Sequence, residues 1–125
     1  MSLGTVTPIL RLFDETMTRE FYVDFLGFQV DWEHRFEGNF PLYMQVSRDG
    51  CLLQLSGHFG DCCPGAAIRI TTTDVDAYQA ELLAKEYRHA RPGVTEAPWG
   101  GREMSIQDPA GNRLTFYNRD PEISA

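Results

Sequence analysis

Aromatic side chains cluster in one stretch of the sequence, where flat rings could stack on a planar ligand. Trp32 and Phe36 are four positions apart in a segment expected to be a strand, so both should point to the same face. A second tryptophan, Trp99, lies in a segment rich in glycine and proline. Aromatic residues on one strand face more often form a core or a dimer interface, so both interpretations stay open here. The candidate ligand-binding rings are those of Trp32, Phe36, Phe40, Tyr43 and Trp99.

Acidic residues lie near these rings and favour a cationic ligand. Asp31, Glu33 and Glu37 flank the first aromatic stretch, and Glu96 precedes Trp99. A negative field attracts a cation over long distances, and an aromatic ring binds it at short range. No motif pairs these carboxylates with a group that would shift their pKa, so we predict no general acid or base. The expected partner is a small molecule that is both cationic and aromatic.

The thiols and imidazoles form no recognisable catalytic or metal motif. The cysteines are Cys51, Cys62 and Cys63, an odd number, and the adjacent pair is poorly placed to bridge itself, so reduced thiols are expected. His58 lies close to Cys62, but no second Cys or His cluster completes the four ligands that zinc prefers. We therefore predict neither a cysteine nucleophile nor a zinc site.

The elements that position these side chains are organised as a repeated unit. A β-branched, apolar segment at 5–12 predicts a strand, and Asp14 can cap the helix that follows. Apolar residues at helical spacing predict that helix over 15–26, with Gly27 at its end. Three strands are expected next, at 28–36, 41–48 and 51–56, the last two joined by an Asp49-Gly50 hairpin.

The same order of elements returns in the second half, where Asp74 follows a strand at 67–70. Thr73 with Asp76 resembles a capping box for the second helix. That helix should bury Val75, Tyr78, Leu82 and Leu83. We then expect a short strand near His89, a loop from Pro92 to Gly101, and strands at about 102–107 and 113–117 joined by the turn Asp108–Asn112.

This repetition predicts an α+β fold of two βαβββ modules in tandem, at about 5–57 and 66–118, which form curved mixed sheets. The modules would make up a single domain, 5–120, between a cloning remnant at 1–4 and a C-terminal tail at 121–125. A four-stranded sheet of this size buries too little by itself, so the modules should pair within or between chains. We expect a homodimer.

Composition argues against several classes of partner. The 125-residue chain carries 11 Lys and Arg against 18 Asp and Glu, a net charge of −7 that disfavours binding to nucleic acid. No segment approaches the ~20 apolar residues of a membrane span, and no basic segment followed by an apolar one begins the chain. We expect a cytoplasmic protein that binds neither nucleic acid nor a membrane.

The repeated layout resembles a known superfamily over about residues 5–117. The segments Phe21–Phe28, Asp74–Asp76 and Asp108–Asn112 are similar to those of the glyoxalase/bleomycin resistance/extradiol dioxygenase (vicinal oxygen chelate) superfamily. Glu96–Glu103, followed by Asp108-Pro109, most resembles the bleomycin resistance proteins within it. An extra residue around Gly100-Gly101 departs from some members, so the loop after Trp99 should have its own shape.

The resemblance offers a test for a metal site. Enzymes of the superfamily hold a divalent metal with His, Gln or Glu on the first and last strands of each half. The matching positions here are Thr7, Gln54, Ala67 and Thr115, and only Gln54 carries a usual donor. Because a catalytic metal needs about three protein ligands, the resemblance implies no metal, no cofactor and no catalytic residue. A different register would instead bring in His58 or Glu103.

The function implied by the resemblance is stoichiometric capture. The chain would be a non-catalytic homodimer that sequesters a cationic, planar antibiotic of the bleomycin group in clefts at the subunit contact. Trp32, Phe36, Phe40 and Trp99 would stack on the ligand, Tyr43 would line the cleft, and Glu96 would lie near the cationic group. Two alternatives remain, namely a metal-dependent glyoxalase-type lyase, isomerase or dioxygenase of the same superfamily, and a binder of an unrelated small metabolite.

Overall fold

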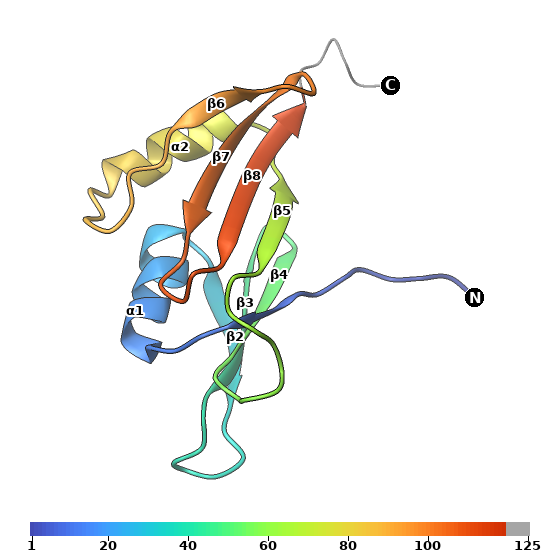
Figure 1. Ribbon diagram of the computed structural model, residues 1–125, viewed down its shortest axis with the longest axis vertical. Helices are drawn as coiled ribbons and strands as arrows, with labels where there is room; N and C mark the ends of the chain where they lie inside the picture. Colours follow the sequence, from blue (N-terminus) through green and yellow to red (C-terminus); the bar gives the residue numbers. More distant parts are fainter. Residues whose placement is uncertain (120–125) are drawn as a thin grey trace.

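The computed structural model describes residues 1–119, whose strands form two four-stranded sheets of the same design (Figure 1). The first sheet has the order β1-β4-β3-β2 and the second the order β5-β8-β7-β6. In each sheet the first strand along the chain runs parallel to the last, and the other pairs are antiparallel. The predicted α+β fold of two βαβββ modules with mixed sheets is confirmed. The strands are β1 (Ile9–Arg11), β2 (Gln29–His34), β3 (Tyr43–Arg48), β4 (Cys51–Ser56), β5 (Ala67–Thr71), β6 (Val94–Ala97), β7 (Gly101–Gln107) and β8 (Arg113–Arg119).

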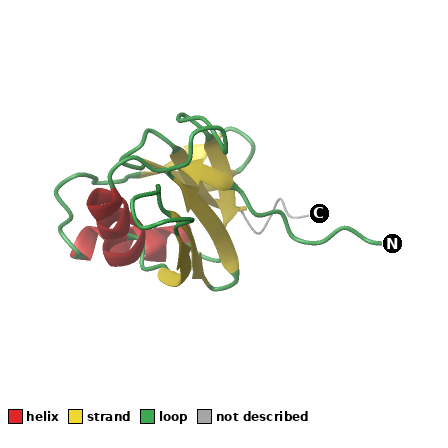
Figure 2. Ribbon diagram, turned by 90° about the horizontal axis from the view of Figure 1, so that it is seen from below, coloured by secondary structure: helices red, strands yellow, loops and turns green. Residues whose placement is uncertain are grey.

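The helices lie together on one side of the two sheets (Figure 2). Helix α1 (Glu15–Arg19) continues into a π-helical turn, η1 (Glu20–Phe25), and α2 (Val75–Ala84) occupies the matching place in the second module. Asp14 caps α1 by accepting a hydrogen bond from the Met17 N–H, as predicted. Asp74 caps α2 through the Ala77 N–H, so the predicted capping box of Thr73 and Asp76 is wrong. None of these helices is long and apolar enough, within residues 1–119, to cross a membrane.

Three predicted strand boundaries are wrong. The first strand is confined to Ile9–Arg11, because only these residues pair with β4. Strand β2 ends at His34, so Phe36 lies beyond it and its orientation does not follow from strand alternation. The strand expected near His89 is instead β6, inside the segment predicted to be a loop, because pairing with β7 overrides its local proline and glycine signals. The C-terminal tail predicted at 121–125 lies outside the described residues.

The core lies between the helices and the sheets. Phe21, Tyr22, Phe25 and Leu26 are buried, as their helical spacing predicts. Leu82 is also buried, whereas Leu83 is 43% exposed, so the prediction for Leu83 is wrong. Gly27 ends the first helical segment with a φ of 82°, and a side chain there would collide with the Arg48 guanidinium.

A buried polar cluster joins the two modules. The Tyr22 hydroxyl of η1 donates a 2.6 Å hydrogen bond to Asp108 Oδ2, in the turn between β7 and β8. Asp108 also accepts from the backbone N–H groups of Ala110 and Asn112 and from the Asn112 side chain. The Asn112 amide donates in addition to the Arg11 carbonyl of β1, at 3.0 Å. A buried carboxylate is thus fully surrounded by donors from both modules.

A second set of contacts joins η1 to α2. The Tyr78 hydroxyl and the Arg48 guanidinium each donate a 2.7 Å hydrogen bond to the Leu26 carbonyl. Lys85 Nζ donates to the Phe25 carbonyl at 2.7 Å. These side chains satisfy carbonyls that the end of a helical segment leaves without partners.

The cluster around Asp108 predicts that Tyr22→Phe is strongly destabilising. The substitution removes a hydrogen bond to a buried charged group, which costs about 1.5–3 kcal/mol of the free energy of unfolding. Urea titration followed by circular dichroism measures the loss. Tyr87→Phe is the matched control because the Tyr87 ring is only partly buried, and it should cost about 0.5 kcal/mol or less. Equal losses in the two variants would contradict the role given to Tyr22.

The same variant should change the alkaline limit of stability. Burial, together with the charge of Asp108, raises the pKa of Tyr22 above its ordinary value. Its contribution is therefore complete below the unfolded pKa near 10 and is lost as the pH rises above that value, because the unfolded chain then releases the proton first. In the same titrations, the free energy of unfolding should fall less steeply above pH ~10 in Tyr22→Phe than in the native protein.

Candidate functional site

The face of the first sheet that points away from the helices carries most of the predicted site residues. Ile9, Gln54, Gln45 and Trp32 are partners in register across β1, β4, β3 and β2. Directly opposite residues in a sheet point to the same side. Leu53, Leu55, Met44 and Val46 alternate with them and are buried on the other side. We call the side with Trp32 the first open face.

A chain of hydrogen bonds crosses this face and ends at Asp31. The Tyr43 hydroxyl donates to Gln54 Oε1 at 2.5 Å, and Gln54 Nε2 donates to Gln45 Oε1 at 3.1 Å. Gln45 Nε2 then donates to Asp31 Oδ2 at 3.0 Å, and Ser47 Oγ donates to Asp31 Oδ1 at 2.8 Å. These hydrogen bonds, first that of Gln45 and then that of Ser47, hold the pKa of Asp31 below its usual value. The face therefore carries a fixed negative charge.

A stacked aromatic pair lies beside this carboxylate. The rings of Trp32 and Tyr43 are parallel to within 1°, with centroids 5.7 Å apart. Trp32 remains 41% exposed. An irregularity in the pairing between Val30 and Trp32 brings Asp31 to the same face as its neighbour, against strict strand alternation. An exposed indole next to a carboxylate suits a ligand that is flat and positively charged.

The remaining aromatic residues of the first stretch extend from the end of β2. His34 is the register partner of Tyr43, and the Phe36 ring contacts His34 edge-on at a centroid distance of 4.7 Å. Phe36 is 68% exposed and also contacts His58, at 5.3 Å. Phe40 is also exposed, in the loop between β2 and β3. Arg35 stabilises this loop by donating a hydrogen bond to the Phe40 carbonyl. The structure thus places Phe36 at the margin of the first open face, whereas Phe40 lies in the loop between β2 and β3.

Trp99 belongs to the matching face of the second sheet, which we call the second open face. Its ring meets Tyr117 edge-on, with centroids 5.6 Å apart. The Arg69 guanidinium lies 4.4 Å from the Tyr117 ring and 5.6 Å from the Trp99 ring, and it approaches Glu103 Oε2 at 3.5 Å. Gly101 makes room for the indole, because a Cβ there would lie 2.2 Å from the Trp99 ring.

Sequence reasoning missed Arg69 and Tyr117. The signal for Arg69 was available, since it interrupts an apolar strand between Ile68 and Ile70, and the alternation of a strand turns it away from them. Tyr117 follows Thr115 by two residues and therefore shares its face. The sequence did not predict that either side chain contacts Trp99, because no local spacing of residues indicates how the 97–101 turn packs.

Glu96 lies away from both open faces. Glu96 of β6 is the register partner of Arg102 of β7, and Arg102 is in turn the register partner of Asn118 of β8. Arg102 donates to Asp76 of α2, and Asn118 accepts from the Val75 N–H of the same helix, so this row points to the helix side. The Glu96 side chain is 88% exposed and lies 3.9 Å from Arg102. The structure does not bring Glu96 to the face that carries Trp99.

The donors at the superfamily's metal positions do not fit a metal ion. Ala67 has no side-chain donor, and the Thr115 hydroxyl is hydrogen-bonded to Ser105 at 2.8 Å. Gln54 uses both ends of its amide within the chain of hydrogen bonds. Among residues 1–119, no group of three or more His, Cys, Asp or Glu side chains could hold a metal. We derive no metal chemistry from this site.

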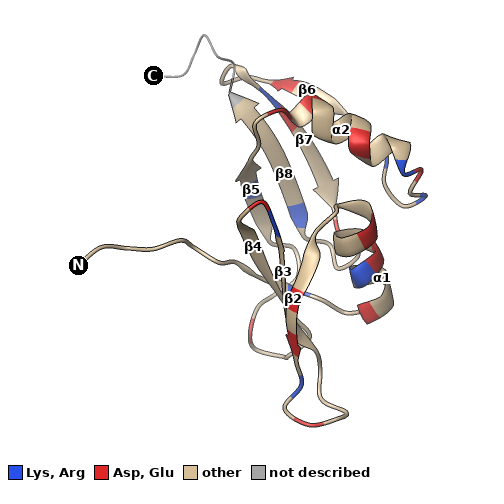
Figure 3. Ribbon diagram, turned by 180° about the vertical axis from the view of Figure 1, so that it is seen from behind, with Lys and Arg blue, Asp and Glu red and all other residues tan. Residues whose placement is uncertain are grey.

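Charge on the helices is mixed, so the negative character at Asp31 is a local property of the first open face. Figure 3 shows acidic and basic residues next to one another on α1. Arg19 of that helix is paired with Glu33, and Glu15 is paired with Arg35. These exposed pairs balance their own charges, whereas the Asp31 carboxylate is held by the neutral side chains of Gln45 and Ser47.

Comparison with known proteins points to one family. A family model described as a glyoxalase superfamily protein matches residues 1–122. Among solved structures, the bleomycin-binding protein from bleomycin-producing Streptomyces verticillus, complexed with copper(II)-bleomycin, is similar at 27% identity and a TM-score of 0.71, covering 96% of this chain and 98% of that chain. TnmS3, an antibiotic binding protein from Streptomyces sp. CB03234, is similar at 25% identity and a TM-score of 0.73, covering 96% and 99%.

A third structure shares the fold at lower identity. The bleomycin resistance determinant encoded on the transposon Tn5 is 21% identical with a TM-score of 0.72, over 94% of this chain and 99% of that one. The curated protein sequences contain no match to this chain.

The packing of Trp99 predicts the effect of Gly101→Ala. The added methyl group would collide with the indole and with the Asn118 carbonyl, 2.7 Å away, and overpacking of this kind costs about 1–3 kcal/mol. Urea titration measures the loss, and tryptophan emission should shift as the indole is displaced. Gly93→Ala is the control, because nothing lies within 4 Å of a Cβ at that position. A Gly101→Ala variant as stable as Gly93→Ala would show that Trp99 does not pack on Gly101.

Proposed function

The chain belongs to the glyoxalase superfamily, and from that premise we propose that it is a non-catalytic binding protein that sequesters a cationic, planar antibiotic of the bleomycin group. The observation that carries the proposal is the exposed Trp32 indole, which is stacked on Tyr43 beside the hydrogen-bonded Asp31 carboxylate. Such a site offers a flat surface and a fixed negative charge to one ligand.

The comparisons support this proposal over an enzymatic one. The two relatives at 25% and 27% identity are described as an antibiotic binding protein and a bleomycin-binding protein. The superfamily also includes enzymes, but the donor set at Thr7, Gln54, Ala67 and Thr115 lacks the ligands that a catalytic metal needs. Near-stoichiometric zinc, nickel, iron or manganese in protein purified without a metal-affinity column would overturn the non-catalytic assignment.

The positions of the side chains support the following proposed ligand contacts. Trp32 and Tyr43 form the stacking surface of the first open face, with Phe36 at its margin and Phe40 in the loop that follows β2. Trp99 is the stacking residue of the second open face. We assign to Asp31 the anionic role that the resemblance implies for Glu96, because Glu96 lies on the helix side while Asp31 adjoins Trp32.

We propose that the protein works as a homodimer. An open sheet face leaves one side of a bound ligand in water, whereas high affinity requires burial of most of its surface. Apolar side chains on or beside the first open face are exposed in the single chain, among them Ile9, Trp32 and Phe36. A second copy placed over the open faces would cover these side chains and enclose a cleft at each subunit contact.

The first test of the function is the affinity for metal-free bleomycin, measured by calorimetry. Trp99→Ala should weaken binding at least about tenfold, which corresponds to about 1.4 kcal/mol, because it removes an aromatic stacking surface. Asp31→Asn should also weaken binding, and it should reduce the salt dependence of the affinity because it removes the charge that attracts the ligand. Leu83→Ala is the control, since this exposed side chain belongs to α2, on the side of the sheets opposite the open faces. Native affinity in both Trp99→Ala and Asp31→Asn would refute the assigned contacts.

The second test is the mass in solution. Sedimentation equilibrium at the concentration used for the titrations should give twice the chain mass of 14.2 kDa. Exposed apolar surface of this kind is typical of a subunit contact. A mass of one chain under the same conditions would exclude the dimeric cleft.

A further inference from the structure

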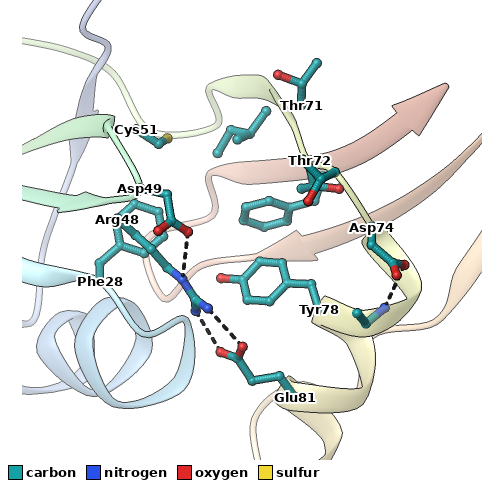
Figure 4. Close-up of a pocket in the computed structure, with 13 residues that line it drawn as sticks. Phe28, Arg48, Asp49, Cys51, Thr71, Thr72, Asp74, Tyr78 and Glu81 are labelled. Carbon is teal, nitrogen blue, oxygen red and sulfur yellow. Dashed lines mark hydrogen bonds and ion pairs between the residues drawn. The ribbon is translucent and has the colours of Figure 1, made fainter.

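A pocket of about 610 Å³ lies on the helix side of the sheets, between the hairpin that joins β3 to β4 and the start of α2 (Figure 4). Its volume falls within the range of sites for small molecules. Both modules contribute to its walls. None of the seven residues proposed above or predicted from the sequence as ligand contacts lines it, so it is separate from the two open faces.

The inner wall of the pocket is apolar. Phe28 of the first module and Ile70 and Phe116 of the second sheet line it, and the Tyr78 ring meets Phe116 edge-on with centroids 5.0 Å apart. Tyr78 is held in place by its hydrogen bond to the Leu26 carbonyl. This wall would receive the hydrocarbon or aromatic part of a ligand.

The mouth of the pocket has an excess of negative charge. Arg48 is its one cationic side chain, and a bidentate ion pair with Glu81, at 2.7 and 2.9 Å, neutralises it. Two further carboxylates, those of Asp49 and Asp74, line the same pocket. Asp74 is engaged as the cap of α2, but the Asp49 side chain is 91% exposed and only approaches Arg48, at 3.6 Å. Asp49 is therefore available to a cation.

An unsatisfied hydroxyl marks the pocket independently of its charge. Thr72 lines the pocket, and its Oγ1 is buried without a hydrogen-bond partner among the described residues. A buried hydroxyl without a partner lowers stability unless a ligand or a water molecule satisfies it. The N–H groups of an ammonium ion are donors of the required kind.

We propose that this pocket binds a small organic amine, whose apolar body packs against Phe28, Ile70 and Phe116 and whose ammonium group lies near Asp49 and Thr72. The site is distinct from the antibiotic site proposed above. The two sites can be tested separately, because neither Trp32 nor Trp99 lines this pocket.

Cys51 provides a reporter inside the pocket. In a Cys62→Ser, Cys63→Ser background it is the chain's single thiol. Burial raises the pKa of the Cys51 thiol, so its alkylation by iodoacetamide is measured at mildly alkaline pH. Phenethylammonium should slow this reaction saturably, by at least about threefold, because it occupies the space in front of the thiol. Phenylacetate has the same ring and the opposite charge, and it should not protect.

Two substitutions test the polar contacts. Asp49→Asn removes the charge and suits the positive φ of 51° at this position, since asparagine tolerates that conformation. It should weaken protection by phenethylammonium about threefold, as for an exposed ion pair. Asp24→Asn, which removes one carboxylate outside the pocket, is its matched control. Thr72→Val should raise the thermal midpoint, because it removes an unsatisfied hydroxyl, and should weaken protection at the same time.

The results separate this proposal from the antibiotic site. Trp99→Ala should leave the protection of Cys51 unchanged. Equal protection by phenylacetate, no protection by phenethylammonium, or equal effects of Asp49→Asn and Asp24→Asn would each overturn the amine site, whatever bleomycin does. Loss of bleomycin binding in Trp99→Ala with intact protection of Cys51 would support both sites.

Discussion

The hydrogen bond from the Tyr22 hydroxyl to Asp108 is the interaction on which the arrangement of the two modules depends. It joins the π-helical turn of the first module to the β7–β8 turn of the second, and Asn112 extends the contact to the Arg11 carbonyl of β1. Moving one module against the other would leave a buried carboxylate without its donors, which is costly. The helices therefore stay together on one side, and the opposite face of each sheet remains available to a ligand (Figure 2).

The two open faces use aromatic rings in different electrostatic settings. On the first face, hydrogen bonds from Gln45 and Ser47 keep Asp31 charged next to Trp32. On the second face, a guanidinium already lies over Trp99 and Tyr117, paired weakly with Glu103. We therefore expect the cationic group of a ligand at the first face, and its neutral or electron-rich rings against Arg69 and Trp99. Gln54, the one usual donor at the superfamily's metal positions, has both ends of its amide engaged in the network of the first face.

The sequence was sufficient for the repeated fold, because caps such as Asp14, the Asp49-Gly50 turn and the period of the first helical segment are local signals. The sequence also indicated Trp32 and Tyr43 as candidate ligand contacts. Strand alternation and pairing bring these two residues to one face. It misplaced what depends on long-range pairing. Strand β6 forms because it pairs with β7. The Glu96 side chain points to the helices because Glu96 is in register with Arg102, which does the same. The irregularity in β2 that brings Asp31 to the open face has no signal in the sequence.

Titration of the purified protein with metal-free bleomycin, followed by intrinsic fluorescence, tests the central claim most directly. The chain has two tryptophans, and Trp32 and Trp99 lie on different open faces. Capture between aromatic faces predicts a saturable change in emission that is complete at one ligand per chain. Emission that stays unchanged throughout the titration, with no heat of binding in calorimetry, would contradict it.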